Sequence, residues 1–275
     1  METKEQLLAE LESINKWEQE QKHLWIWDKI ARLPFKLLDK VTPKIIQDKI
    51  ALLLDEIGSF IQTGGQYLVQ EKTVLKRVQE AHPKLTIESV EDVGRVNLQT
   101  MDAIAEELKK SRANMATVQG ASTGIGGLFT LAVDIPLLLG LSLKTLQEIA
   151  IAYGYDPKQK AERIFIIKCL QFTSSDVVGK KAILTDLSGF YEGRGQSREM
   201  MSQLQGWREV VYTYRDQFGW KKMMQLIPVA GVIFGAFTNR SAVLDVAEAG
   251  SMLYKKRRIM ERLQETNKQA EGSYD

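Results

Sequence analysis

The sequence contains very few of the residue types on which disulfide scaffolds and zinc sites depend. Its 275 residues include one cysteine and two histidines. The single cysteine, Cys169, excludes an internal disulfide, and its apolar surroundings predict a small core residue. His23 and His82 are too few to build a histidine-rich metal site. We therefore predict no metal site and no cofactor.

The sequence also lacks a charge imbalance and strand patterns. Its 37 basic and 35 acidic side chains give a net charge of +2, which argues against nucleic acid as a partner. Only six prolines and few alternating β-branched runs predict an all-α, multi-helix bundle. The first ten residues are polar and net acidic, so we expect no export signal and a cytoplasmic location.

Catalytic motifs are missing as well. The sequence contains no GxSxG, no HExxH and no GxxxxGK[ST] motif. The glycines at positions 124, 126 and 127 follow no strand and precede no lysine, so they do not predict a nucleotide loop. We predict no catalytic residue, and the sequence favours a protein without enzymatic activity.

Two long uncharged segments dominate the middle and the end of the chain. Residues 113–133 carry no charge, and after Asp134 the apolar run continues to Leu143. Mean hydropathy over residues 125–143 is about 1.9, a value typical of membrane spans. Asp134 and Pro136 oppose one straight span, so we predict two helices that meet near Asp134. A second uncharged segment of about 17 residues, around Pro228, is short for a span.

Small residues recur at four-residue spacing in both segments, at Gly120 and Gly124 and at Gly231 and Gly235. Such strips let two helix backbones approach closely. We expect the two segments to pack against each other centrally in the bundle. The spacing suits helix contact in a bilayer and a buried core about equally well, and the interface of a homo-oligomer is a third possibility. Whether residues 120–143 and 227–238 enter lipid is left open.

Asp134 is the polar residue that most needs an explanation, because it lies between Val133 and Ile135. The favoured interpretation is a helix N-cap ahead of Pro136. The alternative is a ligand-binding residue in an apolar cleft, with Asn239 and Arg240 as candidate partners.

Two surfaces are candidates for membrane contact. The first is an aromatic and basic patch near the N-terminus, typical of an interfacial helix, and the second is a basic run near the C-terminus. Ordinary core packing and solvated charge are the respective alternatives. The candidate residues are Trp25, Trp27, Lys29 and Arg32 in the patch and Lys255 and Arg257 in the run.

The pattern predicts three parts of the chain. These are an amphipathic, aromatic-rich helix at residues 1–36, a helical domain at 37–264 with a boundary near 189–197, and a disordered tail at 265–275.

Within the helical domain the pattern also predicts helix ends. One helix is expected to end at the basic cluster 109–112, and Gly154 is expected to cap another. Asp156 is expected to start a helix over 157–172, followed by helices over 174–188 and 241–263.

Taken together, the glycine-rich segment that leads into Asp134 and Pro136, the Tyr153-Gly154-Tyr155 turn and the segment 228–239 resemble the EcsC family of bacterial proteins. The resemblance covers most of residues 20–260. The family is named from a gene beside those of an ABC exporter, so the resemblance implies ABC transporter components as partners and implies no catalytic residues. We expect a non-enzymatic protein at the cytosolic face of the membrane, accessory to transport or secretion, that contacts the inner membrane surface or anionic lipid. The alternative is a soluble helical enzyme or small-ligand-binding protein with a pocket near Asp134.

Overall fold

The structure is a computed structural model, and it describes residues 2–21, 57–64, 69–123, 128–175, 177–191 and 230–271. Within these ranges every regular element is a helix, which confirms the all-α prediction. The predicted division of the chain into three parts stays a prediction.

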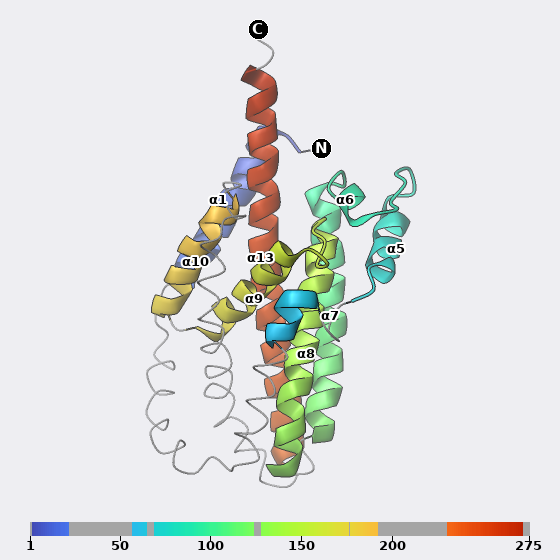
Figure 1. The fold of residues 1–275 in the computed structure, drawn as a ribbon, viewed down its shortest axis with the longest axis vertical. Helices are drawn as coiled ribbons and strands as arrows, with labels where there is room; N and C mark the ends of the chain where they lie inside the picture. Colours follow the sequence, from blue (N-terminus) through green and yellow to red (C-terminus); the bar gives the residue numbers. More distant parts are fainter. Residues whose placement is uncertain are drawn as a thin grey trace.

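Three long helices pack together as a column, and α13 extends beyond the other two toward the C-terminus (Figure 1). The chain descends through α7 and returns through α8, and α13 lies against both, antiparallel to α7. The bounds of these helices are Leu98–Thr123 for α7, Leu128–Ala152 for α8 and Ala230–Glu271 for α13.

Shorter helices surround the upper half of this column (Figure 1). Helices α1 (Lys4–Glu20), α9 (Lys160–Ser174) and α10 (Val177–Tyr191) contact α13 or each other, whereas α5 (Lys72–Ala81) and α6 (Val90–Val93) lie beside α7 and α8. Residues 57–63 form a further helical segment. Capping boxes begin α1, at Thr3, and α6, at Ser89 with Asp92.

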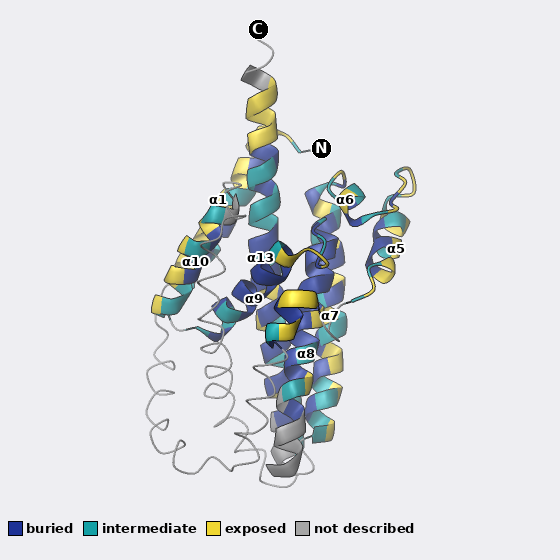
Figure 2. Cartoon of the chain, viewed as in Figure 1, coloured by how far each residue is buried: buried dark blue, intermediate teal, exposed yellow. Residues whose placement is uncertain are grey.

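The core lies where α9 crosses α13 in the upper half of the column, and Figure 2 shows buried residues continuing down α7 and α8. Cys169, Phe165 and Tyr254 have no exposed surface there. Cys169 is thus the buried core residue that the sequence predicts. Burial, followed by the nearby Glu162 carboxylate, raises the pKa of its thiol well above the usual range.

Two predicted helix ends and one predicted start in α7 and α13 are wrong. Helix α7 does not end at residues 109–112 but continues to Thr123, and α13 begins at Ala230 rather than near Ser241. The change from charged to uncharged residues marks a change of surroundings, because small residues such as Ala116 and Gly120 are buried along this part of α7. Helix α13 also continues to Glu271, into the segment expected to be a disordered tail.

Helix α8 passes through Asp134 and Pro136 without a break, so the prediction of two helices meeting there is wrong. A proline inside a helix has no N–H to donate to the carbonyl four residues earlier. Packing of α8 against α7 and α13 accommodates this missing bond. Helix α7 ends at Thr123 and α8 begins at Leu128, and residues 124–127 between them lie outside the described ranges.

The turn after α8 is partly as predicted. Gly154 has a φ of 80°, a left-handed conformation that suits glycine, and this confirms it as the end of the helix. Asp156, however, does not cap the next helix, because α9 begins after Gln159. The Asp156 carboxylate instead accepts a hydrogen bond from the backbone N–H of Lys158 at 2.9 Å.

Candidate functional site: the apolar end of the helical column

One end of the three-helix column carries almost no charge. We call it the apolar end and define it as residues 113–123 of α7, 128–143 of α8 and 230–239 of α13. Asp134 is its one ionisable residue. The three segments lie together at the lower end of Figure 1 because α7 descends to this end while α8 and α13 ascend from it.

Large apolar side chains are exposed at this end. Single exposed apolar residues are common on protein surfaces, but a concentration of them marks an interaction site. Of seven such exposed side chains in the described part of the chain, five belong to the apolar end. They are Met115, Val118, Leu137, Ile233 and Phe237, and the last two are each 70% exposed.

Helices α7 and α13 come into backbone contact inside the apolar end. A Cβ atom added to Gly120 would lie 2.0 Å from the carbonyl oxygen of Gly235. Glycine is therefore required where these two helices cross. Of the other two residues of the predicted strips, Gly124 lies outside the described residues, and Gly231 lies in the first turn of α13.

Asp134 is completely buried between the three helices. Its Oδ1 accepts hydrogen bonds from Nδ2 of Asn239 at 2.8 Å and from Nε2 of Gln119 at 3.2 Å. The N-cap interpretation is wrong, because Asp134 lies inside α8 and accepts these hydrogen bonds from side chains of α7 and α13. Two amide donors offset part of the cost of burying a carboxylate. Oδ1 of Asn239 is itself buried without a partner.

The structure brings together only part of the predicted ligand-binding set. Asn239 contacts Asp134, but Arg240 donates from Nη1 to Oδ1 of Asn114 at 2.8 Å. Sequence reasoning did not find Gln119. Its spacing of 15 residues from Asp134 on an antiparallel neighbour gives no local signal.

Three hydroxyl groups on the α7 part of the apolar end are bonded within their own helix. Thr117 donates to the carbonyl of Ala113 at 2.9 Å, and Ser122 donates to that of Val118 at 2.9 Å. Thr123 donates to the carbonyl of Gln119 at 3.0 Å. Hydroxyls bonded in this way do not depend on water for a partner.

Basic residues border the apolar end on all three helices. On α7, Arg112 donates from Nε to Glu148 at 2.6 Å, and both side chains are mostly buried. On α13, Arg240 binds the neutral Asn114, and on α8, Lys144 is exposed. Among the described residues neither Arg240 nor Lys144 forms an ion pair with a carboxylate.

The predicted basic run on α13 faces the protein. Nζ of Lys255 contacts Glu10 at 2.7 Å and Asp102 at 2.8 Å, and Nη1 of Arg257 contacts Glu162 at 2.8 Å. Burial lowers the pKa of Lys255, but the hydrogen bonds to both carboxylates outweigh it, and the net pKa is raised. These contacts argue against Lys255 and Arg257 as a lipid-facing patch.

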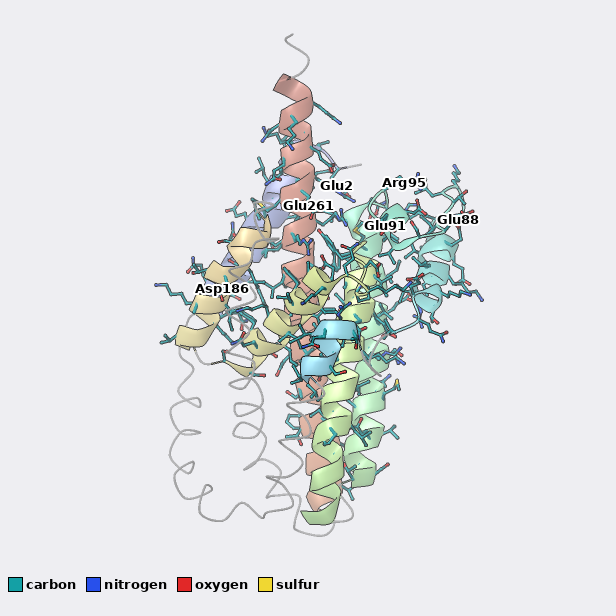
Figure 3. The ribbon with its side chains drawn as sticks, in the orientation of Figure 1. Glu2, Glu88, Glu91, Arg95, Asp186 and Glu261 are labelled. Carbon is teal, nitrogen blue, oxygen red and sulfur yellow. The ribbon has the colours of Figure 1, made fainter. Side chains whose placement is uncertain are left out.

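Neighbouring arginines of α13 bind backbone carbonyls. Arg258 donates to the carbonyl of Tyr153 at 2.7 Å, at the end of α8. Arg262 donates to the carbonyl of Val96 at 2.6 Å and also pairs with Glu2. Figure 3 shows Glu2 and Glu261 beside this part of α13. We assign this charged half of α13 a structural role, because its side chains hold helix ends and the N-terminal segment in place.

Trp25, Trp27, Lys29 and Arg32 lie outside the described residues, so membrane contact through them stays a prediction. Across the ranges that the structure describes, no three His, Cys, Asp or Glu side chains are grouped so as to hold a metal ion. In those same ranges no helix combines the length and apolar character needed to cross a membrane.

An all-α chain with a glycine crossing and an uncharged helical end matches the model of the EcsC protein family over residues 9–259. The chain therefore belongs to the EcsC family. It is 58% identical over 270 residues to the uncharacterized protein YdbA of Bacillus subtilis (strain 168), covering 98% of this chain and 99% of that one. It is also 27% identical over 170 residues to Protein EcsC of the same organism, covering 62% and 69% of the two chains. No solved structure matches this chain.

Proposed function

We propose that this chain is a non-enzymatic helical protein that associates with the cytosolic face of the membrane through its apolar end. The observation that carries the proposal is the concentration of exposed apolar side chains on the uncharged segments of α7, α8 and α13. A soluble surface normally disperses such residues, and an interaction surface gathers them.

The polar groups of the apolar end also support the proposal. The carboxylate of Asp134 is buried, and the hydroxyls of Thr117, Ser122 and Thr123 are bonded to backbone carbonyls. Moving this surface from water to lipid would therefore cost little in lost hydrogen bonds to these groups.

An accessory role in ABC-type transport or secretion is the second part of the proposal. It rests on the family to which the chain belongs, whose name derives from a gene beside those of an ABC exporter. Membrane association would bring the protein to the same surface as transporter subunits. Cross-linking from a photoreactive residue at Arg240, followed by identification of the captured chains, tests this part directly.

Flotation with phospholipid vesicles tests membrane association. We expect the native protein to float and the double variant Ile233→Ser and Phe237→Ser to bind on the order of 100-fold more weakly, because burying the two side chains contributes roughly 3 kcal/mol. Both positions are 70% exposed, so the variant should keep its helical circular dichroism spectrum and melting temperature.

Exposed apolar residues elsewhere provide the matched control. Val178 on α10 is 76% exposed and Leu8 on α1 is 47% exposed. The double variant Leu8→Ser and Val178→Ser should float like the native protein. Equal flotation of both double variants, or no flotation of the native protein at any salt concentration, would overturn the proposal.

The alternative of a soluble enzyme or small-ligand-binding protein with a pocket near Asp134 stays a prediction. A ligand-dependent rise in melting temperature that Asp134→Asn abolishes would favour it.

A further inference from the structure

We infer that the apolar end enters a single leaflet with the helical column upright, and that the positive charges of Arg240 and, further from the apolar end, Lys144 attract anionic phospholipids. This inference rests on the proposed function and adds to it the depth, the orientation and the lipid class.

The depth follows from the lengths of the uncharged helical segments. Ten residues separate Ala230 from Arg240 on α13, which corresponds to about 15 Å along a helix. Eleven residues separate Arg112 from Thr123 on α7, or about 16 Å. The hydrocarbon core of a bilayer is about 30 Å thick, so one leaflet contributes about 15 Å. The uncharged segments of α7 and α13 therefore match one leaflet and do not reach the other side. The uncharged segment of α8, residues 128–143, is longer, about 24 Å, and its upper part is buried in the protein at Leu138, Leu139 and Leu143.

The orientation follows from the directions of the helices. The uncharged segments of α7, α8 and α13 end together, at one end of the column and not along one of its sides (Figure 1). A helix that lay flat on the membrane would instead carry an apolar stripe along its whole length. Above the apolar end, Lys255 and Arg257 of α13 form buried ion pairs with carboxylates of the protein, so this part of the helix does not face lipid.

The lipid class follows from the charge at the border of the apolar end. Of the three basic residues that border the apolar end, Arg112 is neutralised by Glu148. Lys144 is exposed and Arg240 is held by the neutral Asn114, so each retains its positive charge for an external partner. Arg240 directly follows Asn239, which contacts Asp134, so lipid phosphates lie at the depth that its long side chain would reach. Lys144 lies ten residues, about 15 Å, beyond Asp134 on α8, where its charge still attracts an anionic membrane surface.

The nearest acidic groups do not oppose this attraction. Glu148 is 4% exposed and bonded to Arg112. On α13 the first carboxylate beyond Arg240 is that of Asp245, five residues or about 7 Å further from the apolar end. Anionic phospholipid is therefore favoured over zwitterionic lipid.

Site-directed fluorescence measures the depth. Because Cys169 is completely buried, an environment-sensitive thiol probe can be attached to a single introduced cysteine. The probe positions are Ile233→Cys at the apolar end, Met115→Cys near its border and Val178→Cys on α10. With vesicles that contain lipids brominated along the acyl chain, we expect strong quenching at position 233, weaker quenching at 115 and none at 178. Quenching at 178 as strong as at 233 would overturn the upright orientation.

Charge variants measure the lipid class. We expect phosphatidylglycerol to strengthen binding over phosphatidylcholine alone at low salt, by about fivefold for each of the two cations. The double variant Lys144→Gln and Arg240→Gln should lose this preference while keeping the quenching at position 233 in neutral vesicles. The control variant Lys181→Gln, which replaces an exposed lysine of α10, should keep the preference for phosphatidylglycerol.

The two proposals fail differently in this experiment. If the Lys144 and Arg240 variant keeps the full anionic preference while position 233 is quenched, the inferred attraction of anionic lipid is wrong and membrane association stands. If position 233 is not quenched in any vesicle, membrane association through the apolar end is wrong, and the further inference fails with it.

Discussion

Gly120 shows how one residue determines the contact between two long helices. A Cβ atom at this position would lie 2.0 Å from the carbonyl oxygen of Gly235, and backbone atoms cannot move aside as a side chain can. We expect Gly120→Ala to lower the free energy of unfolding by about 3 kcal/mol, at the upper end of the cost of overpacking. Chemical denaturation, monitored by circular dichroism, measures this change in the free energy of unfolding.

Gly189 on α10 is the control for this substitution, because a Cβ atom there would have no neighbour within 4 Å. Gly189→Ala should stabilise the protein by roughly 0.5–1 kcal/mol, since alanine loses less backbone entropy in a helix. Equal effects of the two substitutions would show that helix propensity, and not the contact with Gly235, decides the stability at Gly120.

Cys169 gives a second prediction at this scale. The thiolate is the reactive form, and burial raises the pKa of this thiol well above its usual range. We expect no reaction of the native protein with a thiol reagent at pH 8 over minutes, and stoichiometric reaction after unfolding in guanidinium. Rapid reaction of the native protein would mean that the core around α9 opens readily.

The sequence singles out Asp134 but does not predict its role. The sequence identifies it as the polar residue needing an explanation, because its neighbours are apolar. Its role could not be predicted, because it depends on Gln119 and Asn239, which lie 15 and 105 residues away. Without the helix arrangement, the nearby Pro136 makes a helix start the simplest interpretation.

At the scale of whole elements, Glu2 stabilises the start of α7 from a distant part of the chain. Its carboxylate accepts a hydrogen bond from the backbone N–H of Leu98 at 2.5 Å and pairs with Arg262. Burial raises the pKa of Glu2, but the hydrogen bond from Leu98 and the charge of Arg262 outweigh it, and the net pKa lies below 4.5.

The stabilisation by Glu2 should depend on pH in a defined direction. Because its pKa is lower in the folded than in the unfolded protein, the contribution is present above the unfolded pKa and is lost as pH falls through the folded pKa. We expect Glu2→Gln to cost roughly 1–2 kcal/mol at pH 7 and much less near pH 3. Denaturant titrations across this range measure the difference. Glu12→Gln, at an exposed position of α1, should show no such pH-dependent loss.

The sequence predicts the end of α8 from a local stop signal. Gly154 is such a signal, because its left-handed φ of 80° suits glycine at a helix end. Gly124 directly follows the end of α7, and Pro228 lies two residues before the start of α13, so each boundary has a local signal besides the charge pattern. Both were assigned to changes in charge, but such a change reports what surrounds a helix and not where the helix ends.

At the scale of the whole molecule, the sequence predicts two uncharged segments but not their common position. Residues 113–143 and 230–239 are about 90 residues apart in the chain, and only the antiparallel contact of α7 with α13 brings them to one end of the column. The basic run of α13 shows the same limit. Its sequence predicts a membrane-contact surface, because its acidic partners Glu10, Asp102 and Glu162 are distant in the chain and become visible only in the fold.

The central position of α13 leads to a prediction about the stability of its different parts. This helix contacts α1, α7, α8, α9 and α10. Along residues 242–263 it presents buried residues such as Val243, Leu253 and Ile259, whereas residues 264–269 are exposed.

Amide exchange in a buried helix requires opening of the surrounding core, while an exposed helix end frays locally. We therefore expect hydrogen exchange, followed by mass spectrometry, to be slowest over residues 242–263 and at least 100-fold faster over 264–269. Gly120→Ala should accelerate exchange in the first segment, because it weakens the same column, and leave the second unchanged. Uniform exchange along α13 would show that the helix is not the element around which the column is built.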